Sequence, residues 1–183
     1  MRRVRGPPKD GSRKILYTVP SREALSERLR DCYDQSRGQH VDLTEAEYAG
    51  CVYVLGCENS SSGNAELLSL RDHGKKGVPW WVAPARSAPA RLYVGRAKDL
   101  PRRLWQHIRG AGSGGAHFTD IFVPRRLRRV FLYDRYDQRD ELEGKVSQTI
   151  DRENEDAFVY SDRYDTLRGY KEYGDESGES AND

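Results

Sequence analysis

The sequence predicts an α+β fold in which helices flank a small sheet, with core strands near residues 51–55, 91–94 and 129–133. These three segments are short, apolar and rich in Val, Tyr and Phe, the residue types that suit half-buried strands. Apolar residues recur every fourth position in two other segments, first at Leu100, Leu104 and Ile108 and later at Leu142, Val146 and Ile150. That spacing gives one apolar stripe along each of two helices.

The 183 residues suggest one domain with appendages. We assign residues 1–48 to a basic N-terminal arm and helical extension, and residues 49–161 to the core domain. Residues 58–90 form an insertion between the first two core strands. Residues 162–183 form an acidic flexible tail, because no apolar periodicity is present there to bury.

Charge is distributed unevenly along the chain. Residues 86–130 hold eleven Arg or Lys against two Asp, a local net charge of +9, whereas residues 134–156 hold nine acids against four bases, a net of −5. A basic face beside an acidic one suits a surface that binds a polyanion and has a place for a metal. Two solvated helix faces of opposite sign are the simpler alternative.

Cysteine usage and hydropathy argue against several classes of protein. Cys32, Cys51 and Cys57 form neither an even disulfide framework nor a zinc motif, so we expect reduced, packed thiols. No apolar run approaches the ~20 residues of a membrane span. The basic N-terminus lacks the hydrophobic region of a signal peptide. We therefore expect a cytoplasmic protein without a membrane partner.

Before the core, residues 1–14 carry six bases and one acid among Gly and Pro, and we predict them to be disordered. Such an arm either reaches phosphates or is simply a frayed terminus. Residues 15–19 suit a short strand. Ser21 is positioned to cap a helix over about 22–35, and residues 44–47 suit one further helical turn.

The insertion separates Tyr53 from Tyr93 by forty residues. It begins with a flexible segment at 58–64, offers a helix at 65–71 and ends with Trp80 and Trp81 in a Pro-rich loop. Adjacent tryptophans can stack on exposed bases. They can also pin a long loop onto its own domain, and we favour that interpretation here.

The stretch from residue 91 to 110 predicts a strand followed directly by a helix. Gly95 interrupts the strand, Asp99 caps the helix and the proline after Leu100 is tolerated in the first turn. Arg103 and His107 lie four positions apart, on a second stripe of the same helix.

After that helix, a glycine-serine loop occupies 111–115, and residues 117–120 suit a short helix or an extended segment. The strand at 130–133 follows an arginine-rich run. The last helix spans 139 to about 151, and residues 158–160 suit a final short strand.

Together these features resemble the GIY-YIG nuclease superfamily. Tyr93-Val94-Gly95 stands where that family has Tyr-Ile-Gly, and Arg103 falls at the position of its arginine. Tyr53 matches the tyrosine of Gly-Ile-Tyr, although Cys51 replaces the glycine. The resemblance covers roughly residues 49–160.

The resemblance implies a small three-stranded antiparallel sheet flanked by helices, and a metal-dependent DNA endonuclease. Sheet pairing would bring Tyr53 and Tyr93 to one side with Arg103 over them. Glu143 would hold Mg²⁺ (or Mn²⁺), which neutralises phosphate oxygens, and His117 matches a histidine that some members carry. The basic residues expected to contact DNA are Arg96, Lys98, Arg102, His107, Arg125 and Arg126.

Glu141 and Glu143 point roughly 200° apart on the last helix, so geometry alone does not choose between them. The family motif places apolar residues after its glutamate at offsets that Glu143 meets, and we therefore assign the metal to Glu143. Each tyrosine taken singly suits packing equally well. A nucleic-acid-binding module that keeps the fold without cleaving remains the alternative function.

Overall fold

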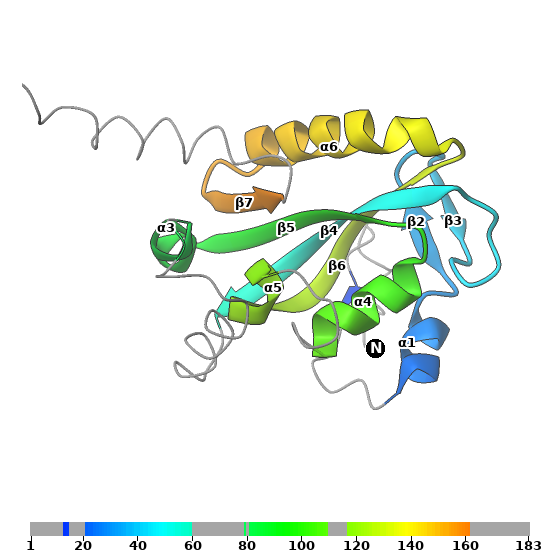
Figure 1. Cartoon of the computed structure of the whole chain (residues 1–183), viewed down its shortest axis with the longest axis horizontal. Helices are drawn as coiled ribbons and strands as arrows, with labels where there is room; N and C mark the ends of the chain where they lie inside the picture. The colour runs from blue at the N-terminus through cyan, green and yellow to red at the C-terminus, as the bar shows by residue number, and fades with distance from the viewer. Residues whose placement is uncertain (1–12, 15–20, 60–78, 80, 110–116, 162–183) are drawn as a thin grey trace, which may run out of the picture.

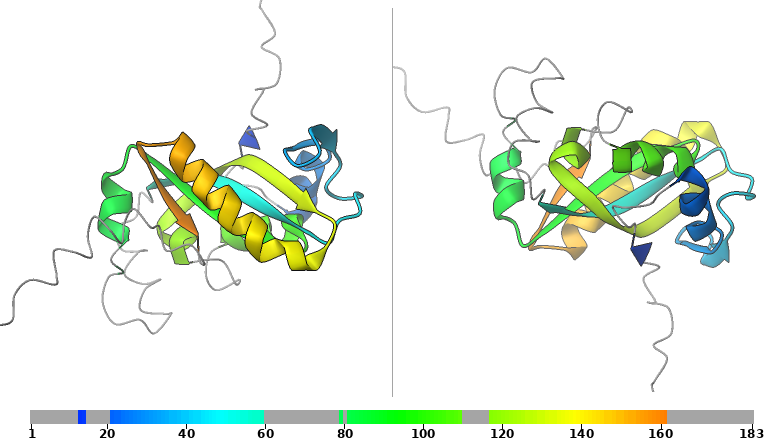
Figure 2. Two further views of the ribbon diagram at one scale, coloured as in Figure 1. Left: turned by 90° about the horizontal axis from the view of Figure 1, so that it is seen from above. Right: turned by 90° about the horizontal axis from the view of Figure 1, so that it is seen from below.

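The computed structural model describes residues 13–14, 21–59, 79, 81–109 and 117–161. In these residues one mixed sheet has helix α6 on one face and helices α4 and α5 on the other (Figure 1). Views from above and below show α6 crossing the strands alone on its face and α4 on the opposite side, near α1 (Figure 2).

Within the described residues the sheet has seven strands in the order β3-β2-β6-β4-β5-β7, with β1 paired to β6 as well. Their bounds are β1 Arg13–Lys14, β2 Cys32–Asp34, β3 Gln39–Val41, β4 Gly50–Asn59, β5 Ala90–Ala97, β6 Phe122–Tyr133 and β7 Ala157–Ser161. The helices are α1 Arg22–Arg28, α3 Val82–Ser87, α4 Leu100–Arg109, α5 His117–Ile121 and α6 Arg139–Glu153, with a 3₁₀ turn η2 at Tyr136–Gln138.

The prediction of a small three-stranded antiparallel sheet is therefore wrong, although the α+β class is confirmed. Strands β5, β4 and β6 are antiparallel neighbours, but β7 pairs parallel with β5 and β2 pairs parallel with β6. The outer strands are short, and their pairing depends on long-range contacts that local sequence does not encode.

The N-terminal region differs most from expectation. Ser21 caps α1 by accepting a hydrogen bond from the Ala24 amide at 3.1 Å, as predicted, but the helix ends at Arg28 rather than near residue 35. Strand β2 comes next in the chain. Its buried Asp34 holds it beside β6 by accepting hydrogen bonds from the amides of Ser36 (2.9 Å) and Leu132 (3.0 Å). Arg13 and Lys14, expected to be disordered, pair with β6.

Strand β6 is also longer than the strand predicted near 129–133. Its four arginines come as two adjacent pairs, and the residue after each pair, Leu127 and then Val130, is buried in the core. The β4–β6 register shifts between these two residues. Pro124 is tolerated because it lies opposite Cys57, where the β4–β6 register shifts. Helix α6 and strand β7 confirm the predictions made for 139–151 and 158–160.

Only part of the insertion is described. Strand β4 continues through Glu58, which was predicted to be flexible, and α3 forms just before β5. Trp81 is buried against Phe118, Phe122 and Tyr160, with ring centroids 5.1–6.3 Å away, so it does pin this segment to the domain. Trp80, the helix predicted at 65–71, the strand predicted at 15–19 and the tail lie outside the described residues.

Strand alternation divides the core between the two faces of the sheet. The face under α4 and α5 carries Cys51, Tyr53, Leu55 and Tyr93, whereas the face under α6 carries Val52, Val54, Leu92 and Val94. All three cysteines are free and buried, as predicted. No described helix is long and apolar enough to cross a membrane.

Candidate functional site

The strands bring the two signature tyrosines together. Tyr53 lies opposite Gly95 in the β4–β5 ladder, and Tyr93 lies opposite Leu55, so the two phenols are diagonal neighbours on one face. Their ring centroids are 6.3 Å apart. Their exposed fractions are 0% and 1%. The predicted juxtaposition is therefore present, and the phenols lie in the core beneath α4.

Gly95 makes this arrangement sterically allowed. A Cβ atom at this position would lie 2.5 Å from Cε1 of Tyr93 and 2.7 Å from the hydroxyl of Tyr53. The sequence suggested that Gly95 interrupts the strand. That prediction is wrong, because β5 continues to Ala97. Its function is to leave room for the two rings on its own face.

Helix α4 places Arg103 over the phenols. Asp99 accepts a hydrogen bond from the Arg102 amide at 2.9 Å, which fixes the start of the helix as predicted. The half-buried guanidinium hydrogen-bonds to the side chains of Tyr53 and Tyr93. Burial works to lower the pKa of Arg103, but the two phenols outweigh it and raise that pKa. Arg103 is therefore a cation that interacts with both phenols, and its Nη1 also donates to Oε1 of Gln106 at 3.2 Å.

His107 lies one turn further along α4 and is only 2% exposed. Its Nε2 is 2.7 Å from the Tyr53 hydroxyl, and its Nδ1 is 2.8 Å from Oγ1 of Thr119. Burial lowers the pKa of His107 to about 3, and the Arg103 charge adds to this effect. The ring is therefore a neutral link inside the cluster, and its burial places it away from the DNA-contacting surface proposed from the sequence.

We call Tyr53, Tyr93, Arg103 and His107 the tyrosine cluster. Its residues come from strands β4 and β5 and from helix α4, and Thr119 of α5 contacts it through His107. Thr119 was not singled out from the sequence. A buried hydroxyl beside a buried histidine has no local pattern, so only the packing of α5 against α4 could identify it.

Glu143 is not part of this cluster. It lies on α6, on the other face of the sheet, and is 3% exposed. Its Oε1 accepts a hydrogen bond from the Ser161 hydroxyl at 3.0 Å, and its Oε2 is 3.5 Å from Nε of Arg96. Arg96 also pairs with Asp140. The structure therefore places Glu143 in a partly buried ion-pair network with Arg96 and Asp140.

This network does not fit a magnesium ion as it stands. Mg²⁺ takes near-octahedral oxygen ligands and retains several waters. Here the Arg96 guanidinium already supplies positive charge between Asp140 and Glu143. In the part of the chain that the structure describes, no group of three His, Cys, Asp or Glu side chains is arranged to hold a metal. A divalent cation at Glu143 would be repelled by the Arg96 guanidinium, whose Nε lies 3.5 Å from Oε2.

The other predicted residues lie in varied settings. Lys98 places its ammonium 4.4 Å from the Tyr136 ring centroid. Arg125 pairs with Glu58 at 3.1 Å. Arg102 on α4 and Arg126 on β6 are exposed, and His117 is the partly buried first residue of α5. Only Arg102 shares a helix with the tyrosine cluster.

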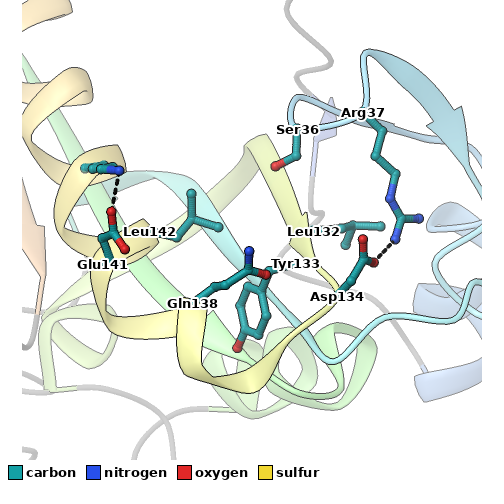
Figure 3. A pocket seen from close by; sticks show the side chains of 9 residues that line it. Ser36, Arg37, Leu132, Tyr133, Asp134, Gln138, Glu141 and Leu142 are labelled. Carbon is teal, nitrogen blue, oxygen red and sulfur yellow. Dashed lines mark hydrogen bonds and ion pairs between the residues drawn. The ribbon is translucent and has the colours of Figure 1, made fainter.

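A separate pocket of about 360 Å³ lies between the turn after β2, the end of β6 and the start of α6 (Figure 3). Arg37 pairs with Asp134 at its rim, and Lys145 pairs with Glu141 at 2.5 Å. Glu141 is thus an exposed helix acid with its own partner. Because each of these two cations is paired with an acid, their charges supply little net attraction for a charged ligand.

Comparison of the chain with protein-family models, with curated proteins and with solved structures found no match.

Proposed function

We propose that the protein is a DNA endonuclease that hydrolyses phosphodiester bonds at the tyrosine cluster. One observation carries the proposal: Arg103 is held by the phenols of both signature strands. A guanidinium fixed in this way can form two parallel hydrogen bonds to a phosphate and stabilise the charge that builds in the transition state. The exposed Arg102 on the same helix adds attraction for the DNA backbone.

In this proposal Arg103 is the group that contacts substrate. Tyr53, Tyr93 and His107 are buried, so their task is to orient the guanidinium and keep its hydrogen-bond geometry constant during turnover. The low pKa of His107, about 3, disfavours a protonated imidazole. We therefore do not propose His107 as the general base that takes a proton from the attacking water.

The proposed requirement for Mg²⁺ or Mn²⁺ rests on the family resemblance. When bound, a divalent cation would neutralise phosphate oxygens. Since the Glu143 network is occupied by Arg96, no step is assigned to the metal.

The test is cleavage of supercoiled, single-stranded and branched DNA, with and without Mg²⁺ or Mn²⁺. We expect Arg103→Ala to abolish cleavage while DNA binding stays nearly intact, because the guanidinium acts mainly in the transition state. Arg102→Ala is the matched control on the same helix and should cleave, with slightly weaker binding. Wild-type protein that leaves every substrate whole would refute the proposal.

A second candidate is a nucleic-acid-binding module without catalysis. The ion-pair network around Glu143 favours it, because that carboxylate faces away from the tyrosine cluster and is already neutralised. Glu143→Gln and Glu141→Gln separate the candidates. An endonuclease with its metal at Glu143 loses Mg²⁺-dependent cleavage only in Glu143→Gln. A binding module shows equal DNA affinity in both variants and no cleavage in either.

A further inference from the structure

Both ring nitrogens of His107 contact hydroxyl groups from other elements. Nε2 is 2.7 Å from the Tyr53 hydroxyl of β4, and Nδ1 is 2.8 Å from Oγ1 of Thr119 on α5. All three side chains are at least 98% buried. The result is a hydrogen-bonded chain that runs from Thr119 through His107 to Tyr53 and ends at Arg103.

The donors and acceptors along this chain are constrained. A guanidinium can only donate, so the Tyr53 oxygen accepts from Arg103 and has one hydrogen to give. A neutral imidazole has one N–H and one acceptor nitrogen. The hydrogen of Tyr53 therefore goes to Nε2, which leaves the imidazole proton on Nδ1. That N–H then needs an acceptor, and Oγ1 of Thr119 lies at hydrogen-bonding distance.

We propose that Thr119 is a positioning residue that stabilises the Nδ1–H tautomer of His107 by accepting from it, and through that tautomer keeps the Tyr53 hydroxyl hydrogen on Nε2. The buried hydroxyl is the acceptor that this tautomer requires. Without it, the Nε2–H tautomer competes, and Nε2 then donates to the Tyr53 oxygen in place of accepting from it.

The consequence for catalysis rests on the proposed endonuclease function, whereas the tautomer itself does not. If Nε2 became a donor, the Tyr53 oxygen would receive hydrogen bonds from both His107 and Arg103. The phenolic hydrogen would then turn elsewhere, and the guanidinium would lose its fixed geometry. Catalytic turnover should respond to this change more than DNA binding does.

The test uses the full chain labelled with ¹⁵N in histidine, observed by long-range ¹H–¹⁵N NMR. The chain has four histidines, and His107→Gln assigns the His107 signals by their disappearance. We expect protonated Nδ1 in the wild type and in Thr119→Ser, which keeps the hydroxyl. In Thr119→Val, which has nearly the same shape, the tautomer ratio should move toward Nε2–H by roughly fivefold.

A wild-type spectrum with the proton on Nε2 overturns the proposal, as does a Thr119→Val protein that folds and keeps the wild-type ratio. If Thr119→Val does not fold, the wild-type and Thr119→Ser spectra still decide the tautomer. In cleavage assays we expect kcat to fall about tenfold in Thr119→Val with KM unchanged, and to be restored in Thr119→Ser. Absence of cleavage by the wild type would remove the proposed function and leave the NMR result standing.

Discussion

Replacement of Gly95 by alanine tests the geometry of the tyrosine cluster without touching any functional group. The added Cβ would meet Cε1 of Tyr93 at 2.5 Å and the hydroxyl and Cζ of Tyr53 at 2.7 and 2.9 Å. These are atoms of two buried rings in a close-packed core, so they cannot swing aside as the end of a surface side chain would.

The cost follows from two opposing effects. Overpacking a core of this kind destabilises by about 1–3 kcal/mol. Loss of a glycine from a strand interior returns about 0.5–1 kcal/mol. We therefore expect Gly95→Ala to lower the free energy of unfolding by a net of up to ~2.5 kcal/mol. For a chain of this size that corresponds to a drop in Tm of up to about 10 °C.

Gly56 provides the matched control on the neighbouring strand. A Cβ there would meet Nε of Arg128 at 3.1 Å, an atom near the end of a flexible side chain, and Cβ of Arg126 at 3.7 Å. Gly56→Ala should be as stable as the wild type or up to about 1 kcal/mol more stable, because little overpacking offsets the loss of a strand glycine. Urea unfolding and thermal melts measure both variants. If Gly95→Ala is as stable as Gly56→Ala, the close approach of the two rings is not what requires glycine.

Two further predictions concern stability. The pKa of His107 in the folded protein, about 3, lies below its unfolded value of 6.5, so the unfolded chain binds the proton first as pH falls. The stability contributed by the neutral ring is therefore complete above pH 6.5 and is lost progressively toward pH 3, with about 2 kcal/mol gone by pH 5. Urea unfolding midpoints measured across this pH range should depend less steeply on pH in His107→Gln than in the wild type. Trp81→Ala should cost about 3–5 kcal/mol, because it empties a site lined by Phe118 and Tyr160. Trp105→Ala, at a half-buried position on α4, should cost clearly less, and equal losses in the two variants would show that Trp81 does not anchor the insertion.

The elements that could be predicted are those whose periodicity is local. Helix α6 follows from Val146 and Ile150, which recur at helical spacing and are buried where expected. Strand β2 could not be predicted, because one of its two buried residues is Asp34, whose Oδ1 accepts a hydrogen bond from an amide of β6 nearly one hundred residues away. The length of β6 was underestimated for a related reason: its arginines find acids such as Glu153 only after folding.

The residues of the candidate site also differ in whether local sequence or tertiary packing sets their positions. Tyr53, Tyr93 and Arg103 come together because strand pairing and a two-residue linker between β5 and α4 fix their positions, and both are readable in the sequence. Which face of the sheet Glu143 occupies depends on where α6 packs, and that is set by the matching of two apolar surfaces.

Strand alternation explains how one short segment can serve both faces. Gly95 faces the tyrosine cluster, and its neighbour Arg96 points to the opposite face, where it pairs with Glu143. The two sites are thus adjacent along β5 while their side chains diverge. If a phosphate were to draw Arg96 away, Glu143 would be left partly buried with an uncompensated charge, which is costly. A divalent cation at Glu143 would compete with the Arg96 guanidinium for that carboxylate, so Arg96→Gln should raise Mg²⁺ affinity there.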